Sequence, residues 1–476
     1  MDLASPPLEL SKAHLESTFA ALKTAYAGSP APDRAARTAQ LKALECMLRD
    51  NMDTFAEAIS KDFSHRSPHE TKMLECFPAL ESIKNALKHL RSWMKPQRSW
   101  ASFWFLPGRT EIRPQPLGVI GIIVPWNYPL FLAITPLVSA LAAGNRAMIK
   151  MSEFSPHVGE LLATLIAKYL PPDQVIVING GPETGKAFSS LPFDHLLFTG
   201  STQVGRHVMR AAAENLTPVT LELGGKSPTI IGNDFPIAEA AERIMYGKCL
   251  NAGQTCIAPD YVLVPLGREN EFVAAARAAV SRHYPTLKDN PDYTAIINER
   301  HLQRLSGYLD DAIAKGATVT ECNPASEVLS GTRKILPAVV TQVTPDMQIA
   351  QEEIFGPILP VFTYKSLNEA IAYVNGQPRP LALYYFGYDQ ADIDRVLDET
   401  ISGGVSINET IMHIAQEHLP FGGVGPSGMG HYHGRFGFET FSKSKPIFHQ
   451  SRLNGLKLLH PPYSKRFDRL IKLLLH

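Results

Sequence analysis

A cysteine closes a polar, glycine-containing turn in the segment 251–256, which reads Asn-Ala-Gly-Gln-Thr-Cys. Most cysteines outside disulfides are small buried apolar residues, but this polar setting is unsuited to a core position. Cys256 is therefore a candidate nucleophile, whose thiol would need an activating neighbour. No histidine stands nearby in the sequence, so a cysteine–histidine hydrolase, which remains an alternative, would need a distant one.

A glutamate ends a β-rich run in the segment 219–226, Val-Thr-Leu-Glu-Leu-Gly-Gly-Lys. On one interpretation, Glu222 is a strand-end residue that faces solvent. On the other, partial burial between Leu221 and Leu223 raises the pKa of the carboxyl toward neutral pH. Such a carboxylate is suited to act as a general base.

Two loops follow apolar strands. Asn127 lies in the loop 125–129, Pro-Trp-Asn-Tyr-Pro, where its amide could donate to a developing oxyanion. The alternative is a loop built for packing by Trp126 and for turn formation by its prolines. The segment 198–205, Phe-Thr-Gly-Ser-Thr-Gln-Val-Gly, predicts a strand, a turn and a helix whose first amides suit a pyrophosphate. It is not the GxGxxG fingerprint, so alone it is a weak signal.

The elements that must position these residues follow from the hydrophobic pattern. Residues 10–95 have helical periodicity, and 94–116 change to Trp-, Pro- and Arg-rich sequence that predicts an extended hairpin. Strands then alternate with helices, which predicts βαβ units and a parallel sheet. The expected strands are 118–124, 147–150, 175–179 and 195–198, and the expected helices are 136–143 and 157–169.

The alternation restarts after Glu222 and predicts a second α/β domain over 223–413. Its expected strands are 229–231, 261–264, 358–362 and 405–408. The glycine-dense stretch 419–430 is expected to be a loop. A chain of 476 residues is too long for one compact core, so two or three domains are expected.

Composition excludes several function classes. Lys plus Arg (46) equals Asp plus Glu (46), so no basic excess favours nucleic acid or anionic lipid. The odd number of cysteines, without paired CxxC spacing, predicts reduced thiols in the cytoplasm. The segment 1–7 lacks the pattern of a secretory signal, and no apolar run reaches the roughly 20 residues of a spanning helix. His431 and His433 lack acidic or cysteine partners at metal spacing, so no metal site is expected.

Taken together and in this order, the four segments resemble the aldehyde dehydrogenase superfamily. Three more segments fit the resemblance: 150–153 (Lys-Met-Ser-Glu), 352–357 (Glu-Glu-Ile-Phe-Gly-Pro) and 419–425 (Leu-Pro-Phe-Gly-Gly-Val-Gly). The similarity covers about residues 20 to 445.

Two further features narrow the resemblance. The short N-terminus and the segment 427–434 (Ser-Gly-Met-Gly-His-Tyr-His-Gly) are most similar to the class 3 branch of the superfamily. Stretches such as 283–293 resemble bacterial coniferyl aldehyde dehydrogenases, so a coniferyl-like aromatic aldehyde is an expected substrate.

The resemblance implies a role for each matching position. Cys256 would be the nucleophile and Glu222 the general base, with the oxyanion held by Asn127 and the Cys256 backbone N–H. The implied cofactor-binding residues are Lys150 and Glu153 at the adenosine ribose, Gly200, Ser201 and Gly205 near the pyrophosphate, and Glu353 and Phe355 at the nicotinamide half. Met151 stands where the family usually has proline, but Glu153 is kept. NAD is therefore the preferred cofactor, although this glutamate does not strictly exclude NADP.

The implied fold is α/β, with a Rossmann-like cofactor domain, a second α/β catalytic domain and a small β oligomerisation extension. The expected boundaries are 1–97 and 116–222 for the dinucleotide-binding domain, 223–413 for the catalytic domain, 98–115 and 441–450 for the extension, and 451–476 for the tail. The extension should pair across the two-fold axis of a homodimer. The basic amphipathic tail is too short and charged to span a membrane, and packing against the partner subunit is favoured.

Two alternatives to a hydrolytic enzyme are weighed. A CoA-acylating relative usually lacks the glutamate at position 222, so its presence favours hydrolysis. A catalytically silent relative would be expected to have lost Cys256 or Glu222, and both are present.

Overall fold

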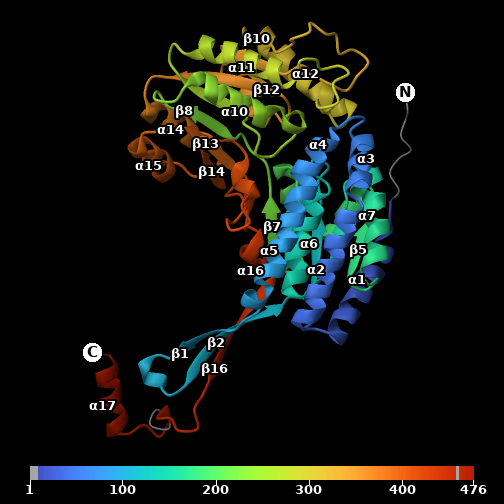
Figure 1. Ribbon diagram of the computed structural model, residues 1–476. Coiled ribbons are helices and arrows are strands. Elements are labelled where there is room, and N and C mark those ends of the chain that lie inside the picture. The colour runs from blue at the N-terminus through green and yellow to red at the C-terminus, as the bar shows by residue number, and fades with distance from the viewer. Residues whose placement is uncertain (1–8, 457–459, 476) are drawn as a thin grey trace.

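The computed structural model describes residues 9–456 and 460–475. Residues 1–8, which include the segment 1–7, and part of the tail (457–459 and 476) lie outside the described residues. The strands of the described residues form three sheets. Figure 1 shows two α/β bodies, one above the other, and a thin β extension below them. The predicted combination of two α/β units and a small β extension is therefore confirmed as a fold.

The lower body is built on a sheet with the order β15-β7-β6-β3-β4-β5, named here the β3 sheet. Its strands are β3 (Val119–Ile123), β4 (Arg146–Lys150), β5 (Val175–Ile178), β6 (His195–Thr199), β7 (Val219–Glu222) and β15 (Gly428–Met429). All pair in parallel except β15, which lies antiparallel to β7. The predicted alternation of strands and helices is confirmed, and the glycine-dense stretch contributes one short strand instead of being loop throughout.

Helices cover both faces of the β3 sheet, as a parallel sheet requires. One face carries α1 (Lys12–Gly28), α8 (Pro182–Ser189) and α9 (Thr202–Ala213). The other carries α2 (Arg34–Asp50), α5 (Phe77–Trp93), α6 (Phe131–Ala143), α7 (Pro156–Tyr169) and α16 (Gly434–Thr440). Between α2 and α5 lie α3 (Met52–Asp62), α4 (Pro68–Thr71) and the π-helical turn η1 (Lys72–Cys76).

Helix α6 starts earlier than the sequence predicted. It begins at Phe131 and contains Pro136, which was expected to be its first residue. Every residue of α6 is buried, so packing on all sides supports the helix despite the backbone hydrogen bond that proline cannot make. The preceding loop, which holds Asn127, is thereby placed directly at a buried helix N-terminus.

The upper body is built on a sheet with the order β10-β11-β12-β9-β8-β13-β14, named here the β9 sheet. Its strands are β8 (Pro228–Ile231), β9 (Tyr261–Pro265), β10 (Thr318–Glu321), β11 (Ala338–Thr341), β12 (Ile358–Tyr364), β13 (Ala382–Phe386) and β14 (Gly404–Ile407). The helices around it are α10 (Ile237–Cys249), α11 (Glu269–His283), α12 (Glu299–Ala314), α13 (Gln348–Gln351), α14 (Leu367–Asn375) and α15 (Gln390–Glu399). The predicted strands are present, and β10, β11 and β13 are additional.

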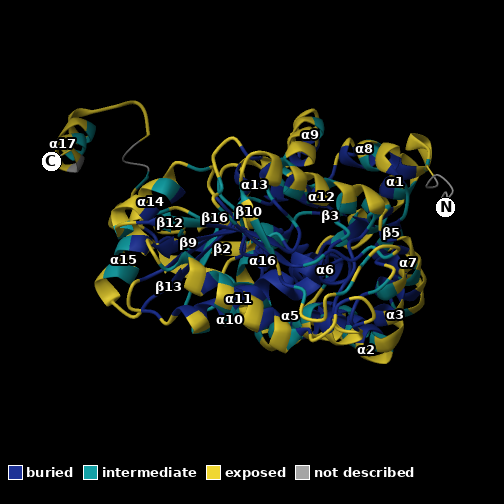
Figure 2. Cartoon of the chain, turned by 90° about the horizontal axis from the view of Figure 1, so that it is seen from above, coloured by how far each residue is buried: buried dark blue, intermediate teal, exposed yellow. Residues whose placement is uncertain are grey.

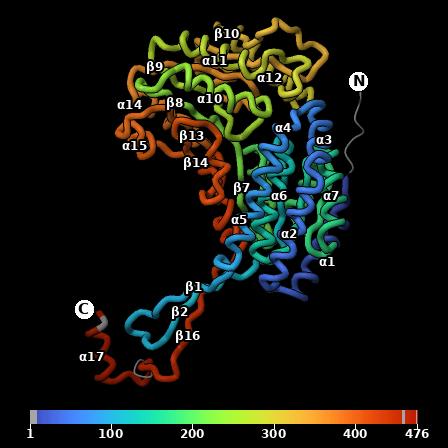
Figure 3. The backbone as a smooth tube through the Cα atoms, viewed as in Figure 1, coloured from blue at the N-terminus to red at the C-terminus, as the bar shows by residue number. Residues whose placement is uncertain are grey.

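The extension is a sheet of β1 (Gln97–Trp100), β2 (Arg109–Pro116) and β16 (Ser442–His449), all antiparallel. Figure 3 shows the two distant chain segments running side by side into it. The hairpin predicted in 94–116 and the strand predicted in 441–450 are thus confirmed, whereas pairing across a two-fold axis stays a prediction. The tail contains helix α17 (Lys465–Leu474), which Figure 2 shows standing apart from the body.

One apolar core connects the two bodies. Its buried side chains come from α2, α5 and α6 in the lower body and from α10, α11 and β9 in the upper body. Figure 2 shows this buried interior surrounded by exposed helices. Within residues 9–456 and 460–475, no helix is long and apolar enough to cross a membrane.

Candidate active site

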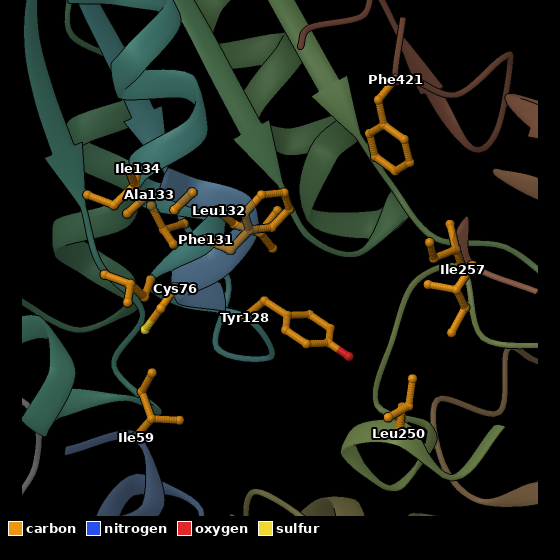
Figure 4. Close-up of a cluster of buried hydrophobic side chains, with 14 of the residues drawn as sticks. Ile59, Cys76, Tyr128, Phe131, Leu132, Ala133, Ile134, Leu250, Ile257 and Phe421 are labelled. Atoms are coloured by element: carbon orange, nitrogen blue, oxygen red, sulfur yellow. The ribbon is translucent and has the colours of Figure 1, made fainter. Parts of the chain in front are cut away.

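A small cavity of about 30 Å³ lies between the two bodies and brings Cys256 and Glu222 to the same space. Most of its wall is apolar and comes from both bodies; its other lining residues are Tyr128, Phe131, Leu132, Thr199, Leu223, Thr255, Ile257, Leu381, Ile414, Phe421 and Tyr432. Figure 4 shows the Tyr128 ring with its hydroxyl directed toward the segment that carries Leu250 and Ile257. The cavity is closed enough to strengthen electrostatic interactions inside it.

Glu222 is buried, so the interpretation of a solvent-facing strand end is wrong. Its side chain is 2% exposed, and neither carboxylate oxygen has a hydrogen-bond partner among the described residues. It ends β7, between Thr199 of β6 and Gly428 of β15. Burial raises the pKa of Glu222 well above its ordinary value. An unpaired carboxylate at such a place can accept a proton from a group in the cavity.

The backbone before Cys256 is held in an unusual conformation. Asn251 and Ala252 both have φ of 51°, in the left-handed region, and Gly253 has φ of 72°. A Cβ at Gly253 would overlap the Gly356 carbonyl, so only glycine fits there. The Gln254 side chain donates to the carbonyls of Asn251 (2.9 Å) and Ala295 (3.1 Å). These contacts present Cys256, half-buried, at the cavity.

The Cys256 thiol is protonated at neutral pH in this arrangement. Burial, together with the carboxylates of Glu353 and Glu222, raises the pKa of the thiol to about 12, and the backbone amides of Cys256 and Ile257 act in the opposite direction. The thiol therefore needs a proton acceptor when it attacks.

Asn127 lies next to the cysteine loop. Its side chain is 4% exposed and donates from Nδ2 to the Gln254 carbonyl at 3.2 Å. The neighbouring Tyr128 hydroxyl and Thr255 Oγ1 share a hydrogen bond of 2.6 Å. The loop predicted to contribute the amide is thus tied on both sides to the segment that carries the thiol.

The three residues expected at a pyrophosphate lie at the start of α9. Ser201 caps the helix by accepting from the Val204 amide at 3.4 Å. The Gly200 amide donates to the Glu222 carbonyl at 3.0 Å, which joins this turn to the end of β7. A Cβ at Gly205 would crowd Leu223, so the glycine allows α9 to pack closely on the sheet.

Lys150 ends β4, and Glu153 lies in the turn that follows the strand. Lys150 is buried, and its Nζ donates to the carbonyls of Met151 and Gly180, both at 2.7 Å. Burial lowers the pKa of Lys150, while Glu153 acts in the opposite direction. Glu153 is half-buried in the turn before α7.

Glu353 and Phe355 lie in the loop before β12. Burial raises the pKa of Glu353 to about 7, with Asp260 adding to the shift. Phe355 has φ of 48° and packs its ring edge-to-face on Trp126, with the ring centroids 5.4 Å apart. A Cβ at Gly224 would overlap the Glu353 carboxylate, so this glycine leaves room for it.

Sequence reasoning missed Asp260, a residue that supports this loop. Asp260 is 3% exposed, accepts from the Ile354 amide at 2.9 Å and forms an ion pair with Lys226. A charged residue between the apolar runs that flank it is the signal that could have indicated a buried partner.

A second missed group lies behind the Asn127 loop. Arg66, Glu70 and Glu75 are buried side chains of the segment around α4 and η1. Glu75 stands in the apolar run Met-Leu-Glu-Cys-Phe at 73–77, and this interruption is the signal that sequence reasoning could have used.

Comparisons with known proteins show the family of the chain. The model of the aldehyde dehydrogenase family matches residues 7–447. A protein of Pseudomonas aeruginosa named as a probable coniferyl aldehyde dehydrogenase is 56% identical over 458 residues, covering 96% of this chain and 95% of that one.

Solved structures give the same result. The substrate-bound state of AldH from Staphylococcus aureus has a TM-score of 0.91 at 39% identity, covering 97% of this chain and 99% of that one. An aldehyde dehydrogenase of Mycobacterium tuberculosis complexed with NAD⁺ has a TM-score of 0.83 at 31% identity, covering 93% and 91%. The resemblance inferred from the seven segments is confirmed. The chain belongs to the aldehyde dehydrogenase family and is an oxidoreductase that uses a nicotinamide cofactor to oxidise an aldehyde to the carboxylic acid.

Proposed function

We propose that the chain oxidises a flat aromatic aldehyde through a thioester on Cys256, with Glu222 as the general base. The observation that carries this proposal is the shared cavity, in which an unpaired buried carboxylate faces the thiol within a largely apolar wall. Apolar surroundings favour bound aldehyde over water, and they strengthen every charge interaction that develops during the reaction.

The first half of the reaction forms a carbon–sulfur bond. Cys256 Sγ attacks the aldehyde carbon and its proton passes to Glu222, whose raised pKa suits it to accept one. The carbonyl oxygen becomes an oxyanion, which the Asn127 amide and the Cys256 backbone N–H stabilise. The C–H bond then breaks, its electron pair leaves as hydride, and a thioester remains on Cys256.

The second half breaks that bond with water. A cavity needs roughly 10–15 Å³ to hold one water molecule, and this one offers about 30 Å³. Glu222 first releases the thiol proton to solvent and is again a carboxylate. It then accepts a proton from the water as the water oxygen attacks the thioester carbon. The C–S bond breaks, Glu222 passes this proton to the departing sulfur, and the carboxylic acid leaves with the thiol restored. This arrangement supports hydrolysis over transfer of the acyl group to CoA.

The cofactor is NAD in this proposal. When bound, the nicotinamide ring accepts the hydride. The residues fit such a group: Gly205 lets α9 lie close to Leu223, Gly224 leaves room for the Glu353 carboxylate, and the N-terminus of α9, capped by Ser201, suits a pyrophosphate. Lys150 and Glu153 would hold the ribose hydroxyls, and Glu353 and Phe355 the nicotinamide half. A carboxylate at Glu153 repels a 2′-phosphate, which favours NAD over NADP.

The substrate is proposed to be an aldehyde of coniferyl type. The relative from Pseudomonas aeruginosa carries that substrate in its name. The rings of Tyr128, Phe131, Phe421 and Tyr432 line the cavity of about 30 Å³, so an aromatic aldehyde whose carbonyl enters it would meet aromatic surface.

We further propose that the protein is a cytoplasmic homodimer. The cofactor is bound by residues 1–97 and 116–222, and the nucleophile is carried by residues 223–413. The subunits are joined by residues 98–115 and 441–450. The extension presents Trp100, Phe103 and Trp104 at 79%, 76% and 52% exposure, which a monomer would leave in water. The five cysteines are free thiols, in keeping with a reducing compartment. The tail, 451–476, is proposed to pack against the partner subunit.

A substrate panel tests the proposal. Cinnamyl-type, benzaldehyde-type and long-chain aldehydes are compared by kcat/KM from NADH formation, with and without CoA and with NAD or NADP. The highest kcat/KM should belong to the cinnamyl type, with no dependence on CoA. A strict requirement for CoA would overturn the proposed hydrolysis of the thioester by water. A preference for long aliphatic aldehydes would overturn the proposed aromatic substrate.

A further inference from the structure

A fully buried ion pair lies behind the loop that carries Asn127. Arg66 Nη1 and Glu75 Oε1 are 2.7 Å apart, and both side chains have no exposed surface. Glu75 belongs to η1, the π-helical turn between α4 and α5. The Arg66 guanidinium also lies over the Tyr128 ring, 4.9 Å from its centroid.

The pair holds both ends of that loop. Arg66 Nη1 donates to the Asn127 carbonyl at 3.2 Å. Glu75 Oε2 accepts from the amides of Leu130 and Phe131, at 2.7 and 3.1 Å, at the N-terminus of α6. Because a helix N-terminus carries partial positive charge, the carboxylate is favoured there.

The same carbonyl connects the loop to the cysteine segment. Asn251 Nδ2 donates to the Asn127 carbonyl and to the Gln254 carbonyl, both at 3.1 Å. Glu70 Oε1 accepts from the Asn251 amide at 3.1 Å. The position of the Asn127 amide relative to the Cys256 backbone is thus set by hydrogen bonds that begin at Arg66.

Stability does not explain a buried pair of this kind. Removing two charges from water is costly, and replacing such a pair by uncharged residues is often neutral or stabilising. Arg66 Nε and Nη2, moreover, find no hydrogen-bond partner among the residues described. The pair is better explained by the geometry that it imposes on the loop.

We propose that Arg66 and Glu75 are positioning residues for the oxyanion: they fix the Asn127 loop so that its amide and the Cys256 N–H point to one place. This inference rests on the proposed role of Asn127. Without the pair, the Asn127 carbonyl keeps only its hydrogen bond from Asn251, and the N-terminus of α6 loses its carboxylate. The loop is then held less firmly, and the amide no longer stays at hydrogen-bond distance from the developing charge.

The test compares variants by the rate of the NADH burst in rapid mixing with a cinnamyl-type aldehyde. The variants are Asn127→Ala, the uncharged pair Arg66→Met with Glu75→Gln, and the combination of all three. If the uncharged pair fails to fold, the second variant is Glu75→Asp with Arg66 kept, which retains both charges and shortens the reach of the carboxylate to the Leu130 and Phe131 amides. Arg37→Lys is the control, because Arg37 is buried and donates to the Ala142 carbonyl at the other end of α6.

The uncharged pair should slow the burst by about 10- to 100-fold, and adding Asn127→Ala should cause little further loss, because both changes remove the same interaction. Alkylation of Cys256 by iodoacetamide and NAD affinity should stay within about twofold. Arg37→Lys should lower the unfolding temperature and leave the burst rate unchanged.

Other outcomes separate the two claims. If Asn127→Ala slows the burst and the uncharged pair does not, the positioning role is wrong and the role of Asn127 stands. If the losses of the pair and of Asn127→Ala add fully, the pair acts on general structure, and the inference also fails. A normal burst in Asn127→Ala would overturn the proposed oxyanion role itself.

Discussion

Glu222 and Cys256 face one cavity although they belong to different bodies of the fold. Glu222 ends β7 of the β3 sheet, whereas Cys256 follows α10, which packs beside the β9 sheet. The pair is therefore formed only when the two bodies are joined by their common apolar core.

Cys256→Ser should keep NAD binding and lose aldehyde oxidation by about 10³-fold or more. A hydroxyl lacks thiolate character near neutral pH, so the first bond does not form. Steady-state NADH formation and cofactor binding by fluorescence measure the two properties. Cys46→Ser is the control, because Cys46 is exposed and outside the site. Near-normal turnover of a Cys256→Ala variant would disprove the nucleophile.

Glu222→Gln should still deliver hydride but stall at the thioester. Rapid mixing should show a burst of NADH of about one equivalent per site, followed by very slow turnover, with the acyl group detectable as added mass on Cys256. Steady turnover without this accumulation would indicate another base. If the burst is lost as well, Glu222 also accepts the thiol proton, and a higher pH should then restore it.

The pH dependence of kcat should follow Glu222. The base must be ionised to accept a proton, and burial raises its pKa well above the ordinary carboxyl value. The rate should therefore fall as pH is lowered through that raised pKa, at a pH where exposed carboxylates are still ionised. The residual kcat of Glu222→Gln should not show this fall at low pH. A fall near pH 4.5 would contradict the burial of the base.

Gly224→Ala should lower the rate of hydride transfer although it changes no charged residue of the site. The added Cβ would overlap the Glu353 carboxylate and displace it. We expect the burst rate to fall by up to about 10²-fold, as for a misplacement of about 1 Å, together with a higher KM for NAD. Gly307→Ala in α12 is the matched control, because a Cβ there meets open space. Equal kinetics of the two variants would argue against a role for Glu353.

The enzyme should be a dimer at micromolar concentration. Light scattering should give twice the chain mass of 52.4 kDa. Trp104→Glu in the extension should shift the mass toward one chain, because it places a charge in the proposed interface. Leu266→Glu changes a similarly exposed apolar residue outside the extension and should have no effect. A monomeric mass for the unchanged protein would count against the assembly.

The sequence was most informative where function requires particular residue types. The turn before Cys256 and the Glu-Leu-Gly-Gly sequence at the end of β7 indicate catalytic segments. The Trp-, Pro- and Arg-rich composition of 94–116 predicts the hairpin of the extension. The contacts of Arg66 and Asp260 could not be predicted, because burial of a charged side chain depends on partners distant in the chain. The local sequence pattern predicts that helix α6 begins at Pro136. The helix begins at Phe131 instead, because its first turn is supported by tertiary packing that the local pattern does not contain.

The pairing of β15 with β7 has a consequence for synthesis of the chain. The backbone edge at Glu222 is completed by Gly428, about 200 residues later. At roughly 5–20 residues per second, the ribosome needs about 10 to 40 s to deliver that partner. During this interval the β7 edge is an open template for pairing with other chains. The β7 edge therefore stays uncovered by its own chain until the last strands emerge.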